Sequence, residues 1–280
     1  MANSLSIVFL LAVSLPLAYL YLLALAAIRS RSTRASQQPR HRFAIAIPAH
    51  NEEAVIGRTV VTLRGLDYPS HLFDIHVVAD HCTDRSAQVV RAAGAIVHER
   101  HEEPQGSKGA ALRWLFQRVL NPESEVMSPK PCDAVVVFDA DTQVDAGFLR
   151  AMAARLSQGE QVIQGQHRIS NPQDGWFAAL TWATFLVDNR FQNQGRANLG
   201  LSAKNMGDSI CLRSDVLRRM GWGEGLTDDY ALRLRLLLHG IRITYEPAAV
   251  GYGEAPATWA VARRQHERWL AGTYRSSRRY

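Results

Sequence analysis

Two aspartates, Asp139 and Asp141, directly follow an apolar run at 134–138 that is rich in β-branched residues. Such a run predicts a strand buried on both faces of a sheet. Because residues i and i+2 of a strand point the same way, we expect both carboxylates at its C-terminal edge, where open α/β sheets bind ligands. Hard oxygen donors there suit Mg²⁺ or Mn²⁺ bridging to a diphosphate. A loop start or helix cap also explains a short D-x-D, so this pattern alone leaves both interpretations open.

Polar residues also come after two earlier apolar runs. In the segment 50–53, Asn51 can cap the next helix, and the helix dipole favours the carboxylates of Glu52 and Glu53 in its first turn. Asp80 ends the second run, where a side chain can cap the next helix or read the edge of a nucleobase. The loop 106–109 can place Lys108 beside phosphate oxygens, although it matches neither a Walker A loop nor a dinucleotide fingerprint.

Two motifs lie further along the chain. Thr-Asp-Asp at 227–229 opens a predicted helix, where the acids act as caps or one serves as a general base beside an acceptor hydroxyl. The segment 258–274 predicts an amphipathic basic helix with aromatic anchors, which fits a membrane interface. Within it, Gln265, Arg268 and Trp269 share one face, which could instead close over a site.

The elements that must position these residues alternate along the chain. Apolar runs predict strands at 43–48, 75–79, 95–98 and 134–138. Helical patterns lie between them at 55–66, 86–93 and 109–119. This alternation predicts βαβ crossovers and a mostly parallel sheet, an α/β fold. Beyond the D-x-D, we expect a helix at 148–156, a strand at 162–169, an aromatic helix at 176–191 and a short strand after Gly207.

The chain begins with an uncharged apolar stretch, residues 5–28. It exceeds the roughly 20 residues that cross a bilayer, and no Lys or Arg precedes it as in a cleaved signal peptide. We therefore expect a retained single N-terminal span, residues 1–29. Arginines in the adjoining basic linker, residues 30–42, place that flank and the catalytic part in the cytoplasm, at the cell membrane.

Composition excludes several classes of protein. With 280 residues and 47% hydrophobic content, core size is not limiting. The three cysteines are far apart and form no C-x-x-C pair, which argues against a disulfide framework or zinc site. A net charge of +6 fits a surface facing anionic headgroups or a polyanionic substrate. Nucleic acid is not expected as a partner, because no aromatic-basic platform or zinc-finger spacing is present.

In order, these elements resemble membrane-bound, inverting family 2 glycosyltransferases of the GT-A type, from residue 43 to about 271. The matching pieces are 48–52, Asp80 with Asp84, Lys108, D-x-D at 139–141, residues 207–213, T-D-D at 227–229 and Q-x-x-R-W at 265–269. The ordered set is similar to motifs of cellulose, chitin and hyaluronan synthases and of some single-transfer lipid glycosyltransferases. The resemblance implies a Rossmann-like, mostly parallel sheet flanked by helices. It also implies a nucleotide-sugar-binding half at 43–145, an acceptor-binding half at 146–256 and an interface helix at 257–280.

The resemblance further implies roles for residues of the first half. Glu52 and Asp80 would hold the nucleotide base, usually uracil. Lys108 would lie by the nucleotide and Asp139 by its ribose or diphosphate. Asp141 would ligate the metal, Mg²⁺ or Mn²⁺.

The resemblance implies roles in the second half as well. Asp229 would be the catalytic base, with Asp228 and Gln265 among the substrate-binding residues. Arg268 and Trp269 would line the donor diphosphate and the acceptor pocket. The family often has Thr-Glu-Asp at 227–229, a difference that leaves the base in place. It also often has Asp-Gly or Asp-Ser at 81–82, where this chain has His-Cys, which leaves base and sugar preference open.

The expected function is therefore inverting transfer of a sugar from a nucleotide-diphosphate sugar to a hydroxyl of a glycan or lipid. A UDP-sugar is the expected donor. A catalytically silent, membrane-tethered nucleotide-sugar binder and a nucleotidyltransferase remain alternatives. Polymer export needs several spans, whereas one is expected here and the chain stops soon after Q-x-x-R-W. Polymer synthesis and a single transfer onto a lipid therefore both stay open, as does a fragment of a longer protein.

Overall fold

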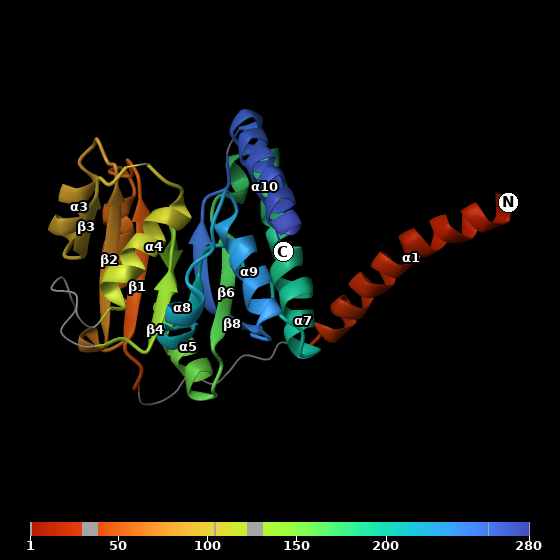
Figure 1. Cartoon of the computed structure of the whole chain (residues 1–280), viewed down its shortest axis with the longest axis horizontal. Helices are drawn as coiled ribbons and strands as arrows, with labels where there is room; N and C mark the ends of the chain where they lie inside the picture. Colours follow the sequence, from red (N-terminus) through yellow and green to blue (C-terminus); the bar gives the residue numbers. More distant parts are fainter. Residues whose placement is uncertain (1, 30–38, 104, 122–130, 257, 280) are drawn as a thin grey trace.

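The structure, a computed structural model, describes residues 2–29, 39–103, 105–121, 131–256 and 258–279. Within these ranges one eight-stranded sheet has the order β3-β2-β1-β4-β7-β6-β8-β5, with helices on both faces (Figure 1). The strands are β1 Phe43–Ala49, β2 Phe73–Asp80, β3 Ile96–Arg100, β4 Ala134–Val137, β5 Gln143–Val144, β6 Val162–Ile169, β7 Ile210–Arg213 and β8 Ile243–Gly253. The α-helices are α1 Ala2–Ala26, α2 Ile56–Arg64, α3 Ser86–Ala93, α4 Lys108–Val119, α5 Phe148–Ser157, α6 Trp176–Val187, α7 Gln194–Asn198, α8 Ser214–Met220, α9 Asp228–Leu238 and α10 Trp259–Arg279. Short helical turns are η1 Ser70–Leu72, η2 Pro172–Asp174 and the π-helical η3 Asp188–Asn193.

The first half of the sheet is parallel. β1 pairs with β2 and β4, and β2 pairs with β3, as the alternation of strands and helices predicted. Side chains of β1 enter two cores: Phe43 and Ile45 pack with α2, α3 and α5, whereas Ala44 and Ala46 pack under α4. Burial on both faces explains why these strands are continuous apolar runs.

The second half of the sheet is mixed. β7 runs antiparallel to both β4 and β6, and β8 pairs in parallel with β6. The start of β7 therefore lies at the same sheet edge as the C-terminal ends of β4, β6 and β8. The predicted α/β class is confirmed, but β8 was missed. Glu246 and Pro247 interrupt its apolar run, and its pairing with β6 shifts register between Gly165 and Gln166.

Helix α1 extends away from the rest of the molecule (Figure 1). Its segment Ser6–Ala26, with mean hydropathy 2.4, is long and apolar enough to cross a membrane. Among its described side chains, only those at the C-terminal end pack on the body. The backbones of α1 and α7 approach so closely there that a Cβ added at Gly195 would overlap the carbonyl oxygen of Leu23. Asn198 Nδ2 also donates to the carbonyl of Ala26 at 2.7 Å. The predicted linker 30–42 lies mostly outside the described residues.

The predicted aromatic helix 176–191 continues to residue 198 through a π-helical turn. Asn189 in this turn is buried and donates through Nδ2 to the carbonyl of His167 at 2.5 Å. π-Helical turns commonly lie at functional sites, and this one fixes the end of β6.

Candidate active site

A cavity of about 510 Å³ opens at the edge where β1, β2, β4 and β8 end. It is lined by Pro48, Ala49, His50, Glu52, Val55, Asp80, Gln105, Gly106, Lys108, Ala111, Asp139, Ala140, Asp141 and Glu254. Five of the predicted site residues therefore share one cavity: Glu52, Asp80, Lys108, Asp139 and Asp141. A larger hollow of about 670 Å³ between α4 and α8 is lined, among the residues that the structure describes, by no carboxylate.

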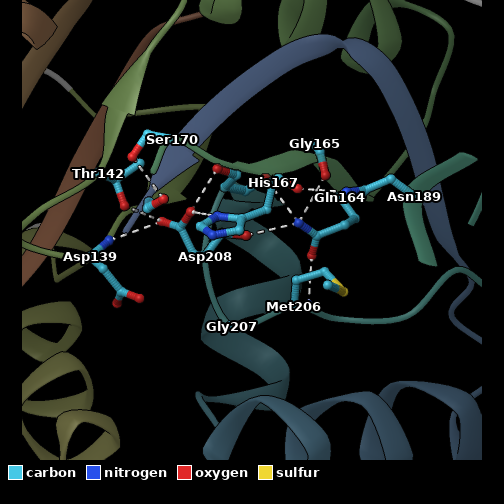
Figure 2. A network of polar contacts seen from close by, with 12 residues as sticks. Asp139, Thr142, Gln164, Gly165, His167, Ser170, Asn189, Met206, Gly207 and Asp208 are labelled. Carbon is cyan, nitrogen blue, oxygen red and sulfur yellow. Dashed lines mark hydrogen bonds and ion pairs between the residues drawn. The ribbon is translucent and has the colours of Figure 1, made fainter. Parts of the chain in front are cut away.

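The D-x-D lies in the turn after β4, which ends at Val137, and not in the strand itself. We expected the two carboxylates to point the same way because alternate residues of a strand do so, and this reason is therefore wrong. The turn is held by Asp208, whose Oδ1 accepts from the backbone N–H of Asp139 at 3.0 Å and from Thr142 Oγ1 at 3.1 Å (Figure 2). This buried carboxylate thus fixes the conformation of the turn.

Asp208 is itself held by His167 on β6, whose Nδ1 lies 2.6 Å from its Oδ2 (Figure 2). Burial alone would raise the pKa of Asp208, but the hydrogen bond and charge of His167 lower it below its usual value. Burial would likewise lower the pKa of His167, but Asp208 raises it. The sequence reasoning missed both residues. The available signal was an acid two residues before the short strand β7, at the ligand-binding edge.

Negative charge is crowded in the cavity. Burial raises the pKa of Glu52, and the charges of Asp141 and Asp139 raise it further. The pKa of Asp141 is raised by burial and by Asp139. Lys108 Nζ forms an ion pair with Asp139, and although burial alone would lower its pKa, Asp139 and Asp228 raise it. Lys108 therefore stays charged and compensates only part of this negative charge.

These residues fit a divalent cation. Asp139 and Asp141 supply hard carboxylate oxygens, and Mg²⁺ sites typically use one or two carboxylates together with substrate phosphates. Among the described residues, no group of three or more His, Cys, Asp or Glu side chains forms a complete metal site. An ion at this position would take further ligands from a phosphorylated substrate or from water.

Asp229 lies beside this cavity without lining it. Lys108 Nζ donates to the carbonyl of Gly207 at 2.8 Å, and a Cβ at Gly207 would lie 3.3 Å from Asp229 Oδ2. Burial raises the pKa of Asp229, and the neighbouring charge of Asp228 raises it further. Asp228, the preceding acid, accepts from Trp222 Nε1 at 2.5 Å and so joins the start of α9 to the loop that follows α8.

The Q-x-x-R-W helix borders a second hollow of about 540 Å³, lined in part by Gln265 and Arg268. Glu254 lines both hollows, so they are adjacent. Trp269 does not line this hollow; its ring lies 5.0 Å from that of His266. Glu254 was missed by the sequence reasoning because it comes after β8, the strand that was not predicted.

Solved structures of glycosyltransferases share this fold. A mannosyltransferase from Pyrobaculum calidifontis, in complex with GDP-mannose and Mn²⁺, superposes with a TM-score of 0.72 at 17% identity, covering 100% of this chain and 76% of that chain. Glucosyl-3-phosphoglycerate synthase from Mycobacterium tuberculosis, in complex with Mn²⁺, UDP and glucosyl-3-phosphoglycerate, gives 0.55 at 17% identity, covering 90% and 82%. The predicted GT-A fold is confirmed.

The sequence defines the family. The model of the family described as "Glycosyltransferase like family 2" matches residues 39–272, so the chain belongs to glycosyltransferase family 2, as its motifs predicted. It is 29% identical over 249 residues to beta-monoglucosyldiacylglycerol synthase from Synechocystis sp., a match that covers 86% of this chain and 49% of the relative. The chain spans about half the length of the curated relatives it matches.

Proposed function

We propose that this chain transfers a sugar from a nucleotide-diphosphate sugar to an acceptor hydroxyl, with inversion at the anomeric carbon. The observation that carries the proposal is the cavity in which Glu52, Asp80, Lys108, Asp139 and Asp141 meet, in a chain of family 2. The structural neighbours bind GDP-mannose or UDP with Mn²⁺, which supports a nucleotide donor and a divalent metal. They leave UDP-sugars and GDP-sugars both as candidates.

The residues divide the reaction between leaving group and nucleophile. When the donor bond breaks, negative charge grows on the leaving diphosphate, which cationic groups such as Lys108 and Arg268 stabilise. A divalent ion held by Asp139 and Asp141 would add Lewis-acid stabilisation of the same charge. Asp229 removes the proton from the acceptor hydroxyl as that oxygen attacks from the opposite face. A single displacement of this kind inverts the configuration.

A membrane-associated acceptor is supported by the side of the molecule that carries α1. There α6 exposes Trp176, Leu180 and Trp182, and α10 exposes Trp259 and Leu270. The two helices pack together, with ring centroids of Phe177 and Trp259 5.6 Å apart. Aromatic and aliphatic side chains in a basic helix suit the boundary between headgroups and acyl chains. The similarity to a glycolipid synthase supports a lipid acceptor. The arginines of the segment 30–42 support a catalytic part on the cytoplasmic side of the cell membrane.

The test is a donor screen on the full chain in detergent, with UDP-sugars and GDP-sugars and with or without Mn²⁺ or Mg²⁺. We expect metal-dependent release of a nucleoside diphosphate that requires a glycan or lipid acceptor. Pyrophosphate release would instead identify a nucleotidyltransferase. Donor binding without turnover on any acceptor would identify a silent binder. Product length distinguishes a single transfer from polymer synthesis.

A further inference from the structure

Two arginines, Arg196 on α7 and Arg233 on α9, lack the partners that cations inside proteins usually have. Each side chain is largely covered, and the Nε of each guanidinium is buried without a hydrogen-bond partner. In the part of the chain that the structure describes, neither guanidinium forms an ion pair. Buried charges are normally paired, because removing a charge from water is costly.

The two arginines form one cluster with two tyrosines. Arg196 Cζ lies 5.5 Å from the ring centroid of Tyr19 on α1. The pKa of Arg233 is lowered by burial and further by the like charge of Arg196, and the nearby Tyr230 and Tyr19 oppose this shift. Tyr230 also contacts Ser277 of α10, with hydroxyl oxygens 3.1 Å apart. Side chains of α1, α7 and α9 therefore meet at a pair of like charges that repel each other, and α10 contacts this cluster through Tyr230.

The adjoining sequence supplies no counter-charge. Residues 30–38, which come after α1, contain two further arginines and no acidic residue. An external anion would compensate both the repulsion and the unpaired N–H groups. Guanidinium groups match phosphate oxygens in paired, charge-assisted hydrogen bonds, so phosphate is the anion best suited to this cluster.

The position of the cluster indicates where the phosphate comes from. Tyr19 lies one turn before Leu23, where α1 begins to pack on the body, and apolar side chains of α1 before Tyr19 are exposed. Tyrosine is enriched at membrane–water interfaces. We propose that Arg196 and Arg233 bind the phosphate group of an anionic lipid headgroup beside α1, at a site separate from the sugar-transfer cavity. This inference rests on the membrane anchorage in the proposed function.

The experiment places the full chain in nanodiscs of phosphatidylcholine and phosphatidylglycerol, and native mass spectrometry counts the lipids retained after extraction. We expect wild type to retain phosphatidylglycerol, and Arg196→Gln/Arg233→Gln to retain about tenfold less, because charge-assisted hydrogen bonds to phosphate are lost. Arg219→Gln, which removes an exposed charge on α8, is the matched control and should retain the wild-type amount. Equal retention in the double variant would overturn the proposal.

Further arms keep the result interpretable. Arg196→Lys/Arg233→Lys preserves charge and fold but not the paired geometry, and should retain an intermediate amount; full retention would contradict the proposed geometry. Inorganic phosphate should compete weakly. If it stabilises the detergent-solubilised protein as much as short-chain phosphatidylglycerol does, the ligand is soluble phosphate and the lipid assignment is wrong.

Lipid retention can be measured without sugar transfer, so the lipid site and the proposed function are tested separately. Retention that depends on the two arginines in a chain that transfers no sugar would refute only the proposed function. A wild-type chain that does not enter nanodiscs would overturn anchorage and lipid site together.

Discussion

The carboxylate of Asp229 lies against Gly207 and beside Lys108, where burial raises its pKa and so strengthens it as a base. We predict that Asp229→Asn binds donor normally but transfers sugar about two to four orders of magnitude more slowly, the usual contribution of general-base catalysis. Nucleoside diphosphate release measures transfer, and calorimetric titration measures donor affinity. Asp215→Asn, an exposed acid on α8, is the control. Near wild-type turnover in Asp229→Asn would rule out its role as the base.

Asp141 carries a separate prediction, because its proposed role concerns the metal. Asp141→Ala should weaken binding of UDP or GDP in Mn²⁺ by about tenfold or more, since a charged metal ligand is lost. It should change affinity little without metal. Asp145→Ala, which alters a nearby exposed acid, should leave both affinities unchanged. An Asp141→Ala variant whose nucleotide affinity still rises with Mn²⁺ as in wild type would contradict the assignment.

At the level of residues, the sequence predicted which acids meet but not what aligns them. Glu52, Asp80, Asp139 and Asp141 could be found because each lies at or just after the C-terminal end of a predicted strand. Asp208 acts through hydrogen bonds to residues more than 60 positions away, which no local pattern encodes. Glu254 belongs to the same edge but comes after an undetected strand.

Among the elements, α10 approaches the N-terminus of α9 at a glycine. A Cβ at Gly272 would lie 2.6 Å from Thr227 Cγ2, next to the acids of the T-D-D motif. We predict that Gly272→Val displaces α10 and lowers sugar transfer by roughly tenfold to a hundredfold, because small misplacements of catalytic groups are costly. Ala271→Val, at an exposed neighbouring position, should retain the wild-type rate. Equal rates for the two variants would show that this packing does not position Asp229.

Most elements were predictable because their patterns are local. The strands of the first half are apolar on both faces, and α3 and β6 begin and end where the sequence indicated. The reversal of β7 and its insertion between β4 and β6 were not predictable, since they depend on which buried surfaces pair. The short β5 at Gln143–Val144 has no periodicity of its own.

At the level of the whole molecule, acid should destabilise the fold through two buried histidines. His76 Nδ1 and His98 Nε2 lie 3.1 Å apart, and burial lowers the pKa of each to about 4. In the unfolded chain these histidines bind protons near pH 6.5, whereas in the folded protein they do so only near pH 4. Their contribution to the free energy of unfolding is therefore fully present above pH 6.5 and is lost as the pH falls toward 4. The loss is on the order of 3 kcal/mol per histidine at most.

Urea unfolding of the full chain in detergent at several pH values measures this effect. We expect His76→Gln/His98→Gln to have a flatter dependence of unfolding free energy on pH between about 6.5 and 4 than wild type. His71→Gln, which changes an exposed histidine, should reproduce the wild-type curve. Identical slopes for the double variant and wild type would show that the two histidines bind protons as readily in the folded protein as in the unfolded chain, so that burial does not lower their pKa.

The fixed attachment of α1 to α7 also affects how the reactants meet. If α1 spans the bilayer and the acceptor is a lipid, as proposed, enzyme and acceptor would diffuse in the same plane and search for each other in two dimensions at a high effective concentration. Only the sugar donor would then arrive from the aqueous phase. The surface density of the acceptor in the membrane, more than its bulk concentration, would then determine how often an acceptor molecule reaches the cavity.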